Sequence, residues 1–486
     1  MTSTYLSMTK SLCGQCKRAV DARISIRDGT VWMEKVCPTH GVAECLVASS
    51  SEWYLDCLSF FAPATKPEAR TPVSAGCPFD CGPCASHEQK TFLPVIPVTS
   101  ACNLDCPICY TVNRNEGAYM MRCEDFAHIL VHLARDHDDL DIINFTGGEP
   151  TLHPELLELL GMAREAGVRR ITVSTNGLKL TDEGYVRRLA ALGARIVLSL
   201  DSLVVETDKA MLGANTVASK LRALDLLQAH DVTTTILPAV AAGYNDVEVG
   251  ALLDLVLTRP HVSSLELHPL TFTGQGGTGF DRKARVTIPD LHRRIEDATG
   301  GRIARGDFVP SPLAHPHCYS ICYLLMLDGG GYVPFVRLAD RRAVFELLGD
   351  SLYLEPREPV ERLFRDVVDD LWADPDRLPE SRRVLATIKR LLGAMFDGDA
   401  SAGERQTMAE RAIKAVYIHA HMDEESFDVA RIMKCPVGVP EVDGTNIPTC
   451  SYNVLYREQD ARFRDPAMLR RMEEARPALH PGPRAR

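Results

Sequence analysis

The sequence lacks long apolar runs and an excess of basic residues. No segment reaches the about 18 consecutive apolar residues that a membrane-spanning helix needs, and the first residues contain no apolar core of a secretion signal. The formal net charge of −11 gives no indication of a polyanion-binding surface. We therefore expect a cytoplasmic protein whose substrate is not a nucleic acid.

The chain is long enough to bury more than one hydrophobic core. It has 486 residues, of which 45% are hydrophobic and 24% charged. At about 150 residues per domain, this length suggests two or three units. We expect an N-terminal metal-binding domain at residues 1–70, a loop at 71–91, a central domain at 92–285, a C-terminal domain at 286–460 and a tail at 461–486.

Cysteine is abundant and unevenly distributed. The 16 cysteines occur in groups rather than evenly along the chain. In a reducing cytosol, cysteines act as metal ligands or as small buried side chains more often than as disulfide partners. Their grouping favours metal ligands.

Short β-branched and apolar segments alternate with helical patterns in the middle of the chain. Such alternation predicts a parallel sheet with helices on its faces. One of the helical patterns, residues 154–167, begins at Pro154 and ends at a glycine. Six strand–helix units are fewer than the eight of a complete TIM barrel, so we expect an α/β fold with a partial (β/α)6 barrel. The predicted strands are residues 92–100, 140–147, 169–176, 194–201, 233–241 and 263–270.

The loop after the first predicted strand carries a motif that can hold iron. Cys102, Cys106 and Cys109 have the spacing C-x3-C-x2-C, and Tyr110 follows directly. Three thiolates can hold a [4Fe–4S] cluster and leave one iron without a protein ligand, whereas electron-transfer clusters are normally closed by four cysteines. Ligands of parallel α/β folds bind at the carboxyl ends of the strands, where this loop lies. We expect the catalytic centre here.

Glycines and polar residues follow the other predicted strands. Gly147, Gly148, Glu149 and Pro150 end the second strand, and two glycines allow the backbone to approach a ligand closely. Polar groups at the later strand ends either contact a cofactor or substrate, or simply cap the strands by hydrogen bonding. These residues are Ser174, Asn176, Ser199, Asp201, Glu266 and His268.

Together these motifs resemble the radical S-adenosylmethionine (radical SAM) superfamily, over about residues 90–285. The resemblance implies that the open iron of the cluster binds the amine and carboxylate of S-adenosylmethionine, with the strand-end residues around it. It also implies a reductant such as flavodoxin or ferredoxin, whose electron cleaves S-adenosylmethionine to a 5′-deoxyadenosyl radical. That radical then abstracts hydrogen from an unactivated carbon of the substrate.

A separate metal site is predicted near the start of the sequence. A C-x2-C pair and a C-x2-H pair flank a predicted strand–turn–strand, a spacing that suits one tetrahedral metal. Zinc is the first choice from ligand chemistry, and a thiolate-rich site also accepts iron. Cys45 or Cys57 could replace the histidine as fourth ligand. The expected ligands are Cys13, Cys16, Cys37 and His40.

Seven further cysteines predict one or two auxiliary iron–sulfur clusters. One group repeats the C-x3-C-x2-C spacing just before the first predicted strand, with His87 or a distant cysteine as fourth ligand. The other group is widely separated, so it forms a cluster only if the fold brings its members together, and otherwise consists of buried side chains. The first group is Cys77, Cys81 and Cys84, and the second is Cys318, Cys322, Cys435 and Cys450.

The order of these motifs, from about residue 11 to 458, resembles the tetraether-lipid-synthase-like branch of the superfamily, also known as class D radical SAM methyltransferases. The resemblance also rests on a TIPD segment at 287–290 and a final C-x14-C-S-Y-N. It implies a rubredoxin-like mononuclear iron or zinc site, an α-rich C-terminal region with auxiliary clusters, and C–C bond formation on a lipid or other long apolar substrate. The segment at 435–444 departs from the pattern of the branch, which leaves the substrate open.

Three functions therefore remain to be distinguished. C–C bond formation on a lipid predicts a deep tunnel lined by Leu, Met and Phe. Methyl or one-carbon transfer to a small substrate such as a pterin predicts a compact polar pocket. Peptide modification predicts a separate winged element, for which the sequence shows no pattern. A basic amphipathic helix at 380–396 either contacts anionic lipids at a membrane surface or packs on its own domain.

Overall fold

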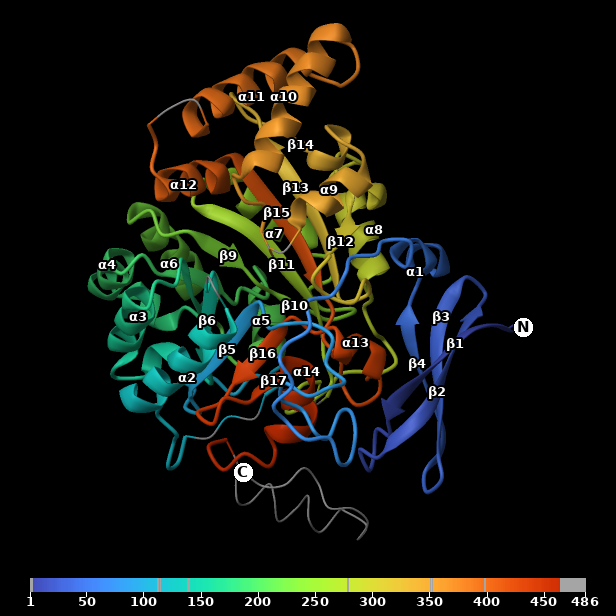
Figure 1. The fold of residues 1–486 in the computed structure, drawn as a ribbon. Coiled ribbons are helices and arrows are strands. Elements are labelled where there is room, and N and C mark those ends of the chain that lie inside the picture. Colours follow the sequence, from blue (N-terminus) through green and yellow to red (C-terminus); the bar gives the residue numbers. More distant parts are fainter. Residues whose placement is uncertain are drawn as a thin grey trace.

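The computed structural model describes residues 3–463, apart from residues 112, 114, 138–139, 278, 350, 352 and 397–398. Within this part, one sheet of 13 strands lies at the centre, and a sheet of four strands precedes it in the chain (Figure 1). Beyond its first three residues, the tail expected at 461–486 lies outside the described part of the chain.

The N-terminal sheet is an antiparallel meander. Its strands pair in chain order, and Asp28 and Gly29 turn the chain between the second and third with φ of 48° and 78°. This turn is the one predicted from the sequence, since left-handed residues fit a tight hairpin. The helix α1 (Ser51–Cys57) follows. The strands are β1 (Ser3–Leu12), β2 (Ala19–Arg27), β3 (Thr30–Cys37) and β4 (Gly41–Ala48).

The six strands predicted for the central region are all present. They lie side by side in chain order, and every neighbouring pair is parallel. The fifth is shorter than predicted, and the two-residue strand β10 (Ala239–Val240) beyond it pairs instead with the end of the sixth. The six are β5 (Leu93–Thr99), β6 (Ile142–Gly147), β7 (Arg170–Thr175), β8 (Arg195–Leu198), β9 (Thr234–Ile236) and β11 (Val262–Pro269).

Helices cover one face of these strands. Side chains at alternate strand positions, such as Phe145 and Leu265, are fully buried in a core shared with the helices. This alternation follows from the two-residue period of a strand, which sends successive side chains to opposite faces. The helix expected from Pro154 begins two residues later. The helices are α2 (Cys123–Asp136), α3 (Leu156–Glu165), α4 (Glu183–Ala191), α5 (Val205–Leu212), α6 (Val217–Ala229), α7 (Val249–Thr258) and α8 (Ile288–Ala298).

The C-terminal region completes both edges of the central sheet. β15 (Ile413–His419) lies parallel to β11, and β16 (Val437–Pro440) lies parallel to β5, so eight parallel strands stand in a row. The C-terminal region, expected to be α-rich, thus contains strands as well as helices. Antiparallel strands flank the row: β12 (Val309–Pro310), β13 (Tyr319–Met326) and β14 (Tyr332–Pro334) beside β15, and β17 (Asn446–Pro448) beside β16.

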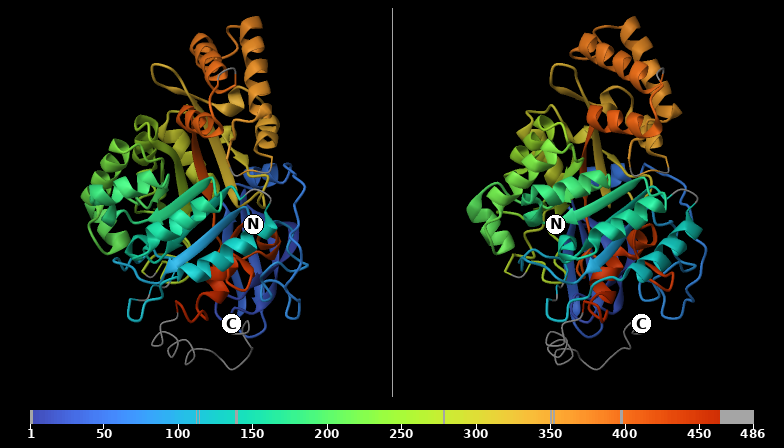
Figure 2. Two further views of the ribbon diagram at one scale, coloured as in Figure 1. Left: turned by 60° about the vertical axis from the view of Figure 1, so that its left-hand side comes forward. Right: turned by 90° about the vertical axis from the view of Figure 1, so that its left-hand side faces the viewer.

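The amphipathic helix predicted at 380–396 is α11 (Ser381–Met395), and it packs on its own domain. Its apolar residues, among them Ile388 and Met395, are buried in a second core with α10 (Glu358–Ala373) at one end of the molecule (Figures 1 and 2). Its Arg390 pairs with Asp328. Among the described residues, no helix combines the length and the apolar character needed to cross a membrane. The remaining helices are α9 (Arg341–Leu348), α12 (Ala402–Ala412), α13 (Val429–Met433) and α14 (Thr449–Ser451).

The N-terminal sheet rests against a late segment of the chain, as the adjoining blue and red ribbons in Figure 1 show. The buried Lys35 ammonium donates to the carbonyls of Leu12 (2.6 Å), Glu424 (2.8 Å) and Glu425 (2.7 Å). A buried charge is tolerated only when its hydrogen bonds are satisfied, so this ammonium fixes the sheet against residues 424–425.

Candidate active site

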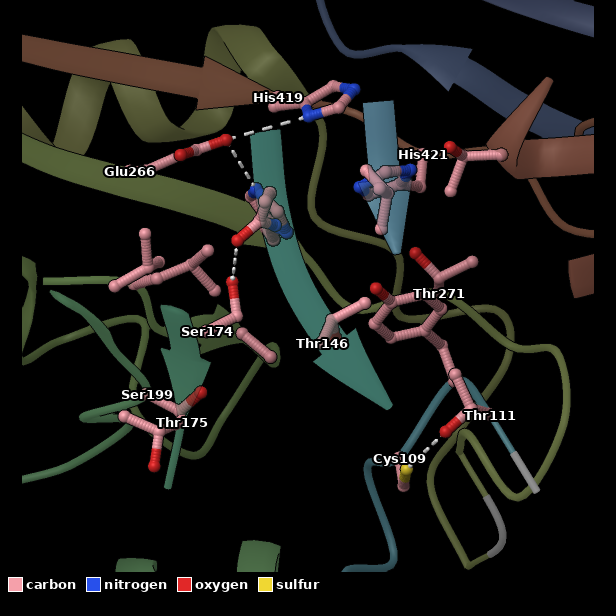
Figure 3. A pocket seen from close by; sticks show the side chains of 18 of the residues that line it. Cys109, Thr111, Thr146, Ser174, Thr175, Ser199, Glu266, Thr271, His419 and His421 are labelled. Carbon is pink, nitrogen blue, oxygen red and sulfur yellow. Dashed lines mark hydrogen bonds and ion pairs between the residues drawn. The ribbon is translucent and has the colours of Figure 1, made fainter. Parts of the chain in front are cut away.

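A cavity of about 320 Å³ lies along the face of the parallel strands opposite the helices. Alternate positions on neighbouring strands line it. Val95, Asn144 and Ser174 point inward, while the adjacent residues Ile96, Phe145 and Val173 pack outward in the core. Figure 3 shows Thr146, Ser174 and Ser199 around this space, together with Cys109 and Thr111 of the loop after β5. The cavity therefore lies where a parallel α/β fold places its ligands.

The three cysteines after β5 line this cavity, as the sequence predicted for a ligand-binding loop. Cys109 Sγ lies 3.2 Å from Thr111 Oγ1 (Figure 3), and the Cys102 amide donates to Asn115 Oδ1 at 2.9 Å. Burial raises the pKa of Cys102 to about 11 and also raises that of Cys106. A buried thiol with a raised pKa loses its proton only when a nearby cation compensates the thiolate charge. Three such thiols in one loop therefore suit a bound iron cluster, whose positive iron ions provide that compensation.

The two glycines at the end of β6 are required by the close approach of the cysteine loop. A Cβ on Gly147 would lie 2.3 Å from the Thr99 carbonyl oxygen, and one on Gly148 would lie 2.2 Å from that of Ala101. The Gly148 amide donates to Thr99 O (2.8 Å) and the Glu149 amide to Ala101 O (2.7 Å). These two N–H groups are thus engaged by the protein, and they position the loop that carries the cysteines.

Glu149 joins the ends of two strands. Its buried carboxylate accepts hydrogen bonds from Thr151 Oγ1 (2.6 Å), Thr175 Oγ1 (2.7 Å) and the Asn176 amide (2.7 Å). Burial raises its pKa even though these hydrogen bonds favour the charged form. Pro150 begins a short 3₁₀ turn, Pro150–Leu152, next to it. Both residues organise the backbone around the cavity.

The polar residues at the later strand ends also face the cavity. Ser174 Oγ donates to Asn144 Oδ1 at 3.0 Å, and Ser199 lies on the same wall. Asn176 Nδ2 donates to Asn103 Oδ1 at 2.7 Å and so connects β7 to the cysteine loop. The structure brings these side chains together around one space, as expected for residues at neighbouring strand ends.

Two cations in the cavity wall were not predicted. Lys220 is fully buried, and its ammonium lies 3.6 Å from the buried carboxylate of Asp201. Arg457 is also buried, and neither its Nε nor its Nη2 has a hydrogen-bond partner in the described part of the chain. Lys220 could have been recognised, because it lies on the apolar stripe Val217–Lys220–Leu224–Leu227 of α6.

Glu266 and His268 on β11 meet two further histidines that the sequence did not indicate. Glu266 Oε1 lies 2.9 Å from His268 Nε2 and 3.6 Å from His419 Nδ1. Although burial opposes ionisation, its hydrogen bonds to the two imidazoles lower the pKa of Glu266. His421 stacks on Tyr110, with ring centroids 5.6 Å apart and planes inclined by 17°. Tyr110 thereby connects the cysteine loop to the segment after β15.

Most of the cysteines expected at the auxiliary sites lie near one another. Cys77, Cys81, Cys84 and His87 line one small cavity together. Burial raises the pKa of Cys435 and Cys450, and the nearby thiolate charges add to this effect: that of Cys318 at both residues and that of Cys450 at Cys435. Arg431 Nε donates to Cys318 Sγ at 3.3 Å.

Cys322 does not belong to that group, which corrects the expectation from the sequence. It lies on β13 with its side chain in the outer core beside Leu324 and Val416, whereas Tyr319 and Ile321 of the same strand face the cavity. Burial raises the pKa of the Cys322 thiol, and its charged neighbours are Asp307 and Arg337 rather than other cysteines.

The N-terminal site has the predicted composition. Cys13, Cys16, Cys37 and His40 place one ligand atom each within 4.8 Å of the others. His40 Nδ1 lies 3.4 Å from Cys13 Sγ and 3.5 Å from Cys37 Sγ. Cys45, one of the two alternative fourth ligands, is instead buried in the core of the sheet. This set of three thiols and one imidazole suits tetrahedral zinc or iron.

Comparisons with known proteins agree with this arrangement. The model of the radical SAM superfamily matches residues 96–256, and that of the HMPTM N-terminal zinc ribbon domain matches residues 5–49. A 7,8-dihydro-6-hydroxymethylpterin dimethyltransferase from Methanocaldococcus jannaschii is 28% identical over 489 residues, covering 93% of this chain and 94% of that protein. A probable GTP 3′,8-cyclase from Saccharolobus islandicus is 29% identical over 203 residues, which are 41% of this chain and 63% of the cyclase.

Among solved structures, Streptococcus suis SuiB bound to precursor peptide SuiA has a TM-score of 0.36 and 20% identity, and the match covers 44% of this chain and 46% of that one. The two family matches identify residues 96–256 of this chain as a radical SAM domain, which follows an N-terminal zinc ribbon at residues 5–49.

Proposed function

We propose that this protein is a radical SAM enzyme that transfers a methyl or one-carbon group to a small polar heterocycle of the pterin class. The observation that carries the proposal is the compact cavity beside Cys102, Cys106 and Cys109, in which hydroxyl, amide and charged groups stand among apolar side chains. The similarity to the pterin dimethyltransferase over nearly the full length of both chains supports it.

The size of the cavity argues against a long apolar substrate. A lipid tunnel would be lined by Leu, Met and Phe; leucines such as Leu93 and Leu237 do line this cavity, but none of its described lining residues is Met or Phe. The volume of about 320 Å³ is at the lower end of the 300–1,000 Å³ or so typical of ligand pockets. Because S-adenosylmethionine must occupy part of this space, a small planar substrate fits better than an alkyl chain. The expectation of C–C bond formation on a lipid therefore gains no support.

The lining offers the groups that a pterin needs. Hydroxyl and amide groups of Asn144, Ser174 and Thr235 can exchange hydrogen bonds with the edge of a heterocycle. Tyr353 and Tyr417 add aromatic surface on which a planar ring can stack. Lys220 and Arg457 supply positive charge for anionic groups of the bound molecules.

The cysteine loop would hold the [4Fe–4S] cluster that this reaction requires. Cys102, Cys106 and Cys109 are the ligands in this proposal, and Glu149 with the two preceding glycines keeps their loop in place. When bound, the cluster supplies the electron that cleaves S-adenosylmethionine. The protein's own part is to orient the substrate carbon and to exclude water from the cavity.

The test is a mass-spectrometric assay on anaerobically reconstituted protein with dithionite, S-adenosylmethionine and 7,8-dihydro-6-hydroxymethylpterin. We expect 5′-deoxyadenosine formation to increase with the pterin, and the pterin to gain the mass of one or two methyl groups. Deuterated methyl groups on S-adenosylmethionine, compared with a ¹³C-labelled methylene-folate donor, show where the added carbon originates.

Cys106→Ala is the inactive control, because it removes a cluster ligand. The same assay with long-chain lipids in place of the pterin tests the alternative substrate class. If the pterin is neither consumed nor able to stimulate cleavage while lipid is coupled, the proposal is wrong.

A further inference from the structure

Three imidazoles converge in the cavity, and one of them, that of His421, stacks on Tyr110 next to the cysteine loop. His268 lies on β11, His419 ends β15, and His421 follows two residues later. One ring nitrogen of each lies within 4.8 Å of those of the other two. The ring centroids are 5.1, 4.9 and 4.0 Å apart. In Figure 3, His419 and His421 lie in the upper part of the view and Cys109 in the lower part.

The register of the sheet produces this convergence. β11 and β15 are parallel, and Leu267 pairs with Ile418 in the outward-facing row. The next residue on each strand, His268 and His419, is therefore turned toward the cavity, and the two lie beside each other. His421 lies just after the end of β15, and its ring centroid is 4.0 Å from that of His419.

Each ring has one nitrogen that faces an orienting group and a second one without a hydrogen-bond partner in the described part of the chain. Glu266 Oε1 faces His268 Nε2 (2.9 Å) and His419 Nδ1 (3.6 Å), while Cys450 Sγ lies 3.6 Å from His421 Nδ1. Tyr319 stacks on His419, with centroids 3.8 Å apart and planes inclined by 19°. Metal-binding histidines characteristically direct their other ring nitrogen to a carboxylate or similar acceptor, which fixes the tautomer and the ring plane.

We propose that His268, His419 and His421 bind one divalent transition-metal ion, Zn²⁺ or Fe²⁺, with Glu266 as the carboxylate that orients two of the rings. Imidazole is a ligand that both ions accept. A set of three protein ligands leaves a coordination position open, as in catalytic rather than structural sites. That position would face the space that Cys109 also lines, so the ion would act as a Lewis acid toward an oxygen or nitrogen atom of the substrate.

This site is separate from the zinc ribbon and does not depend on the proposed function. The ribbon ligands are thiol-rich, whereas the three ligands here are nitrogens. The difference gives the experiment its readout, because thiolates and imidazoles produce distinct spectra with the same cobalt ion.

The experiment uses the full-length, anaerobically purified protein with its clusters oxidised, a state in which [4Fe–4S] clusters give no EPR signal. After mild chelation, Co²⁺ is added and followed by EPR, with pulsed EPR to detect imidazole nitrogens. Zinc released from the ribbon is counted, so that exchange there is recognised. We expect one added Co²⁺ per chain, coupled to imidazole nitrogens and without thiolate-to-cobalt absorption.

Variants assign the signal to these residues. His268→Ala and His419→Ala should lose the nitrogen-coupled Co²⁺, and Glu266→Gln should weaken its binding by about 10- to 100-fold. His230→Ala is the matched control, because this partly exposed histidine lies at the end of α6 and contacts Glu183 instead. Glu266→Gln changes little volume, so it tests the site even if an alanine variant folds poorly.

Three results would overturn the proposal. The first is the absence of any Co²⁺ beyond that exchanged at the ribbon. The second is unchanged Co²⁺ affinity in Glu266→Gln. The third is loss of the ion in Cys450→Ser, since this would show that His421 serves the neighbouring cysteine site rather than the two other histidines.

Discussion

Substitution of Gly148 by alanine tests how the cysteine loop is held. The added Cβ would lie 2.2 Å from the Ala101 carbonyl oxygen and 2.6 Å from the carbonyl carbon. Both atoms belong to the backbone that leads to Cys102, so the loop itself must move. Overpacking of this kind costs about 1–3 kcal/mol of stability. A displacement of about 1 Å in a catalytic group costs on the order of 100-fold in rate, so we expect activity to fall more than stability.

Gly161→Ala is the matched control for this substitution. Gly161 lies within α3, and a Cβ there would meet nothing within 4 Å, so alanine should stabilise the helix by about 0.5–1 kcal/mol. Iron per chain, the rate of 5′-deoxyadenosine formation and the thermal midpoint are measured for both variants. Equal cluster content and equal activity in the two would refute the argument that the glycine holds the loop.

Three further predictions concern other parts of the chain. Cys322→Val should leave the iron content per chain unchanged, because this thiol lies in the core between the sheet and its helices. Cys450→Ser should lower the iron content. A loss of iron in both variants would show that Cys322 is a ligand after all. Cys16→Ser should remove one non-cluster metal ion per chain and expose residues 3–49 to limited proteolysis. The reason is that binding of a structural zinc contributes about 10–16 kcal/mol to folding. A protease-resistant ribbon without metal would contradict this prediction. Burial lowers the pKa of His292 to about 3. Below pH 6.5 the unfolded chain therefore binds a proton that the folded chain does not, and the free energy of unfolding falls as the pH drops toward 3. At pH 5.5 this proton uptake lowers the free energy of unfolding by about 1.4 kcal/mol, so denaturant unfolding of His292→Asn should depend on pH less steeply by that amount; an equally steep dependence would show that the imidazole is protonated in the folded state.

Local patterns account for what the sequence predicted well. The six central strands were identified because short, β-branched, apolar segments between helical patterns favour buried parallel strands over other conformations. The ligands of the N-terminal site were identified because two short motifs, each fixed by its own spacing, lie on either side of one hairpin. Cys102, Cys106 and Cys109 were placed in a ligand loop for the same reason, since their spacing depends on only eight residues.

Long-range pairing accounts for what the sequence did not predict. β15 and β16 reach the two edges of the central sheet across more than a hundred residues, and nothing in their own sequence specifies the strand beside which each lies. Cys322 was grouped with Cys435 and Cys450 because separation along the chain carries no geometry, and the pleat of β13 turned its side chain to the other face.

The sequence by itself therefore determined the chemistry that this protein can carry, because ligand type and local spacing decide which metals and cofactors a loop can hold. The tertiary structure alone decided what shares the cavity with that loop. His419 and His421 meet His268 and Glu266 only because β15 pairs in register with β11, and Lys220 and Arg457 reach the same space from a helix and from the end of the described chain. The physical reason is that the side chains around a cavity are selected by strand register and packing, which are properties of the whole fold.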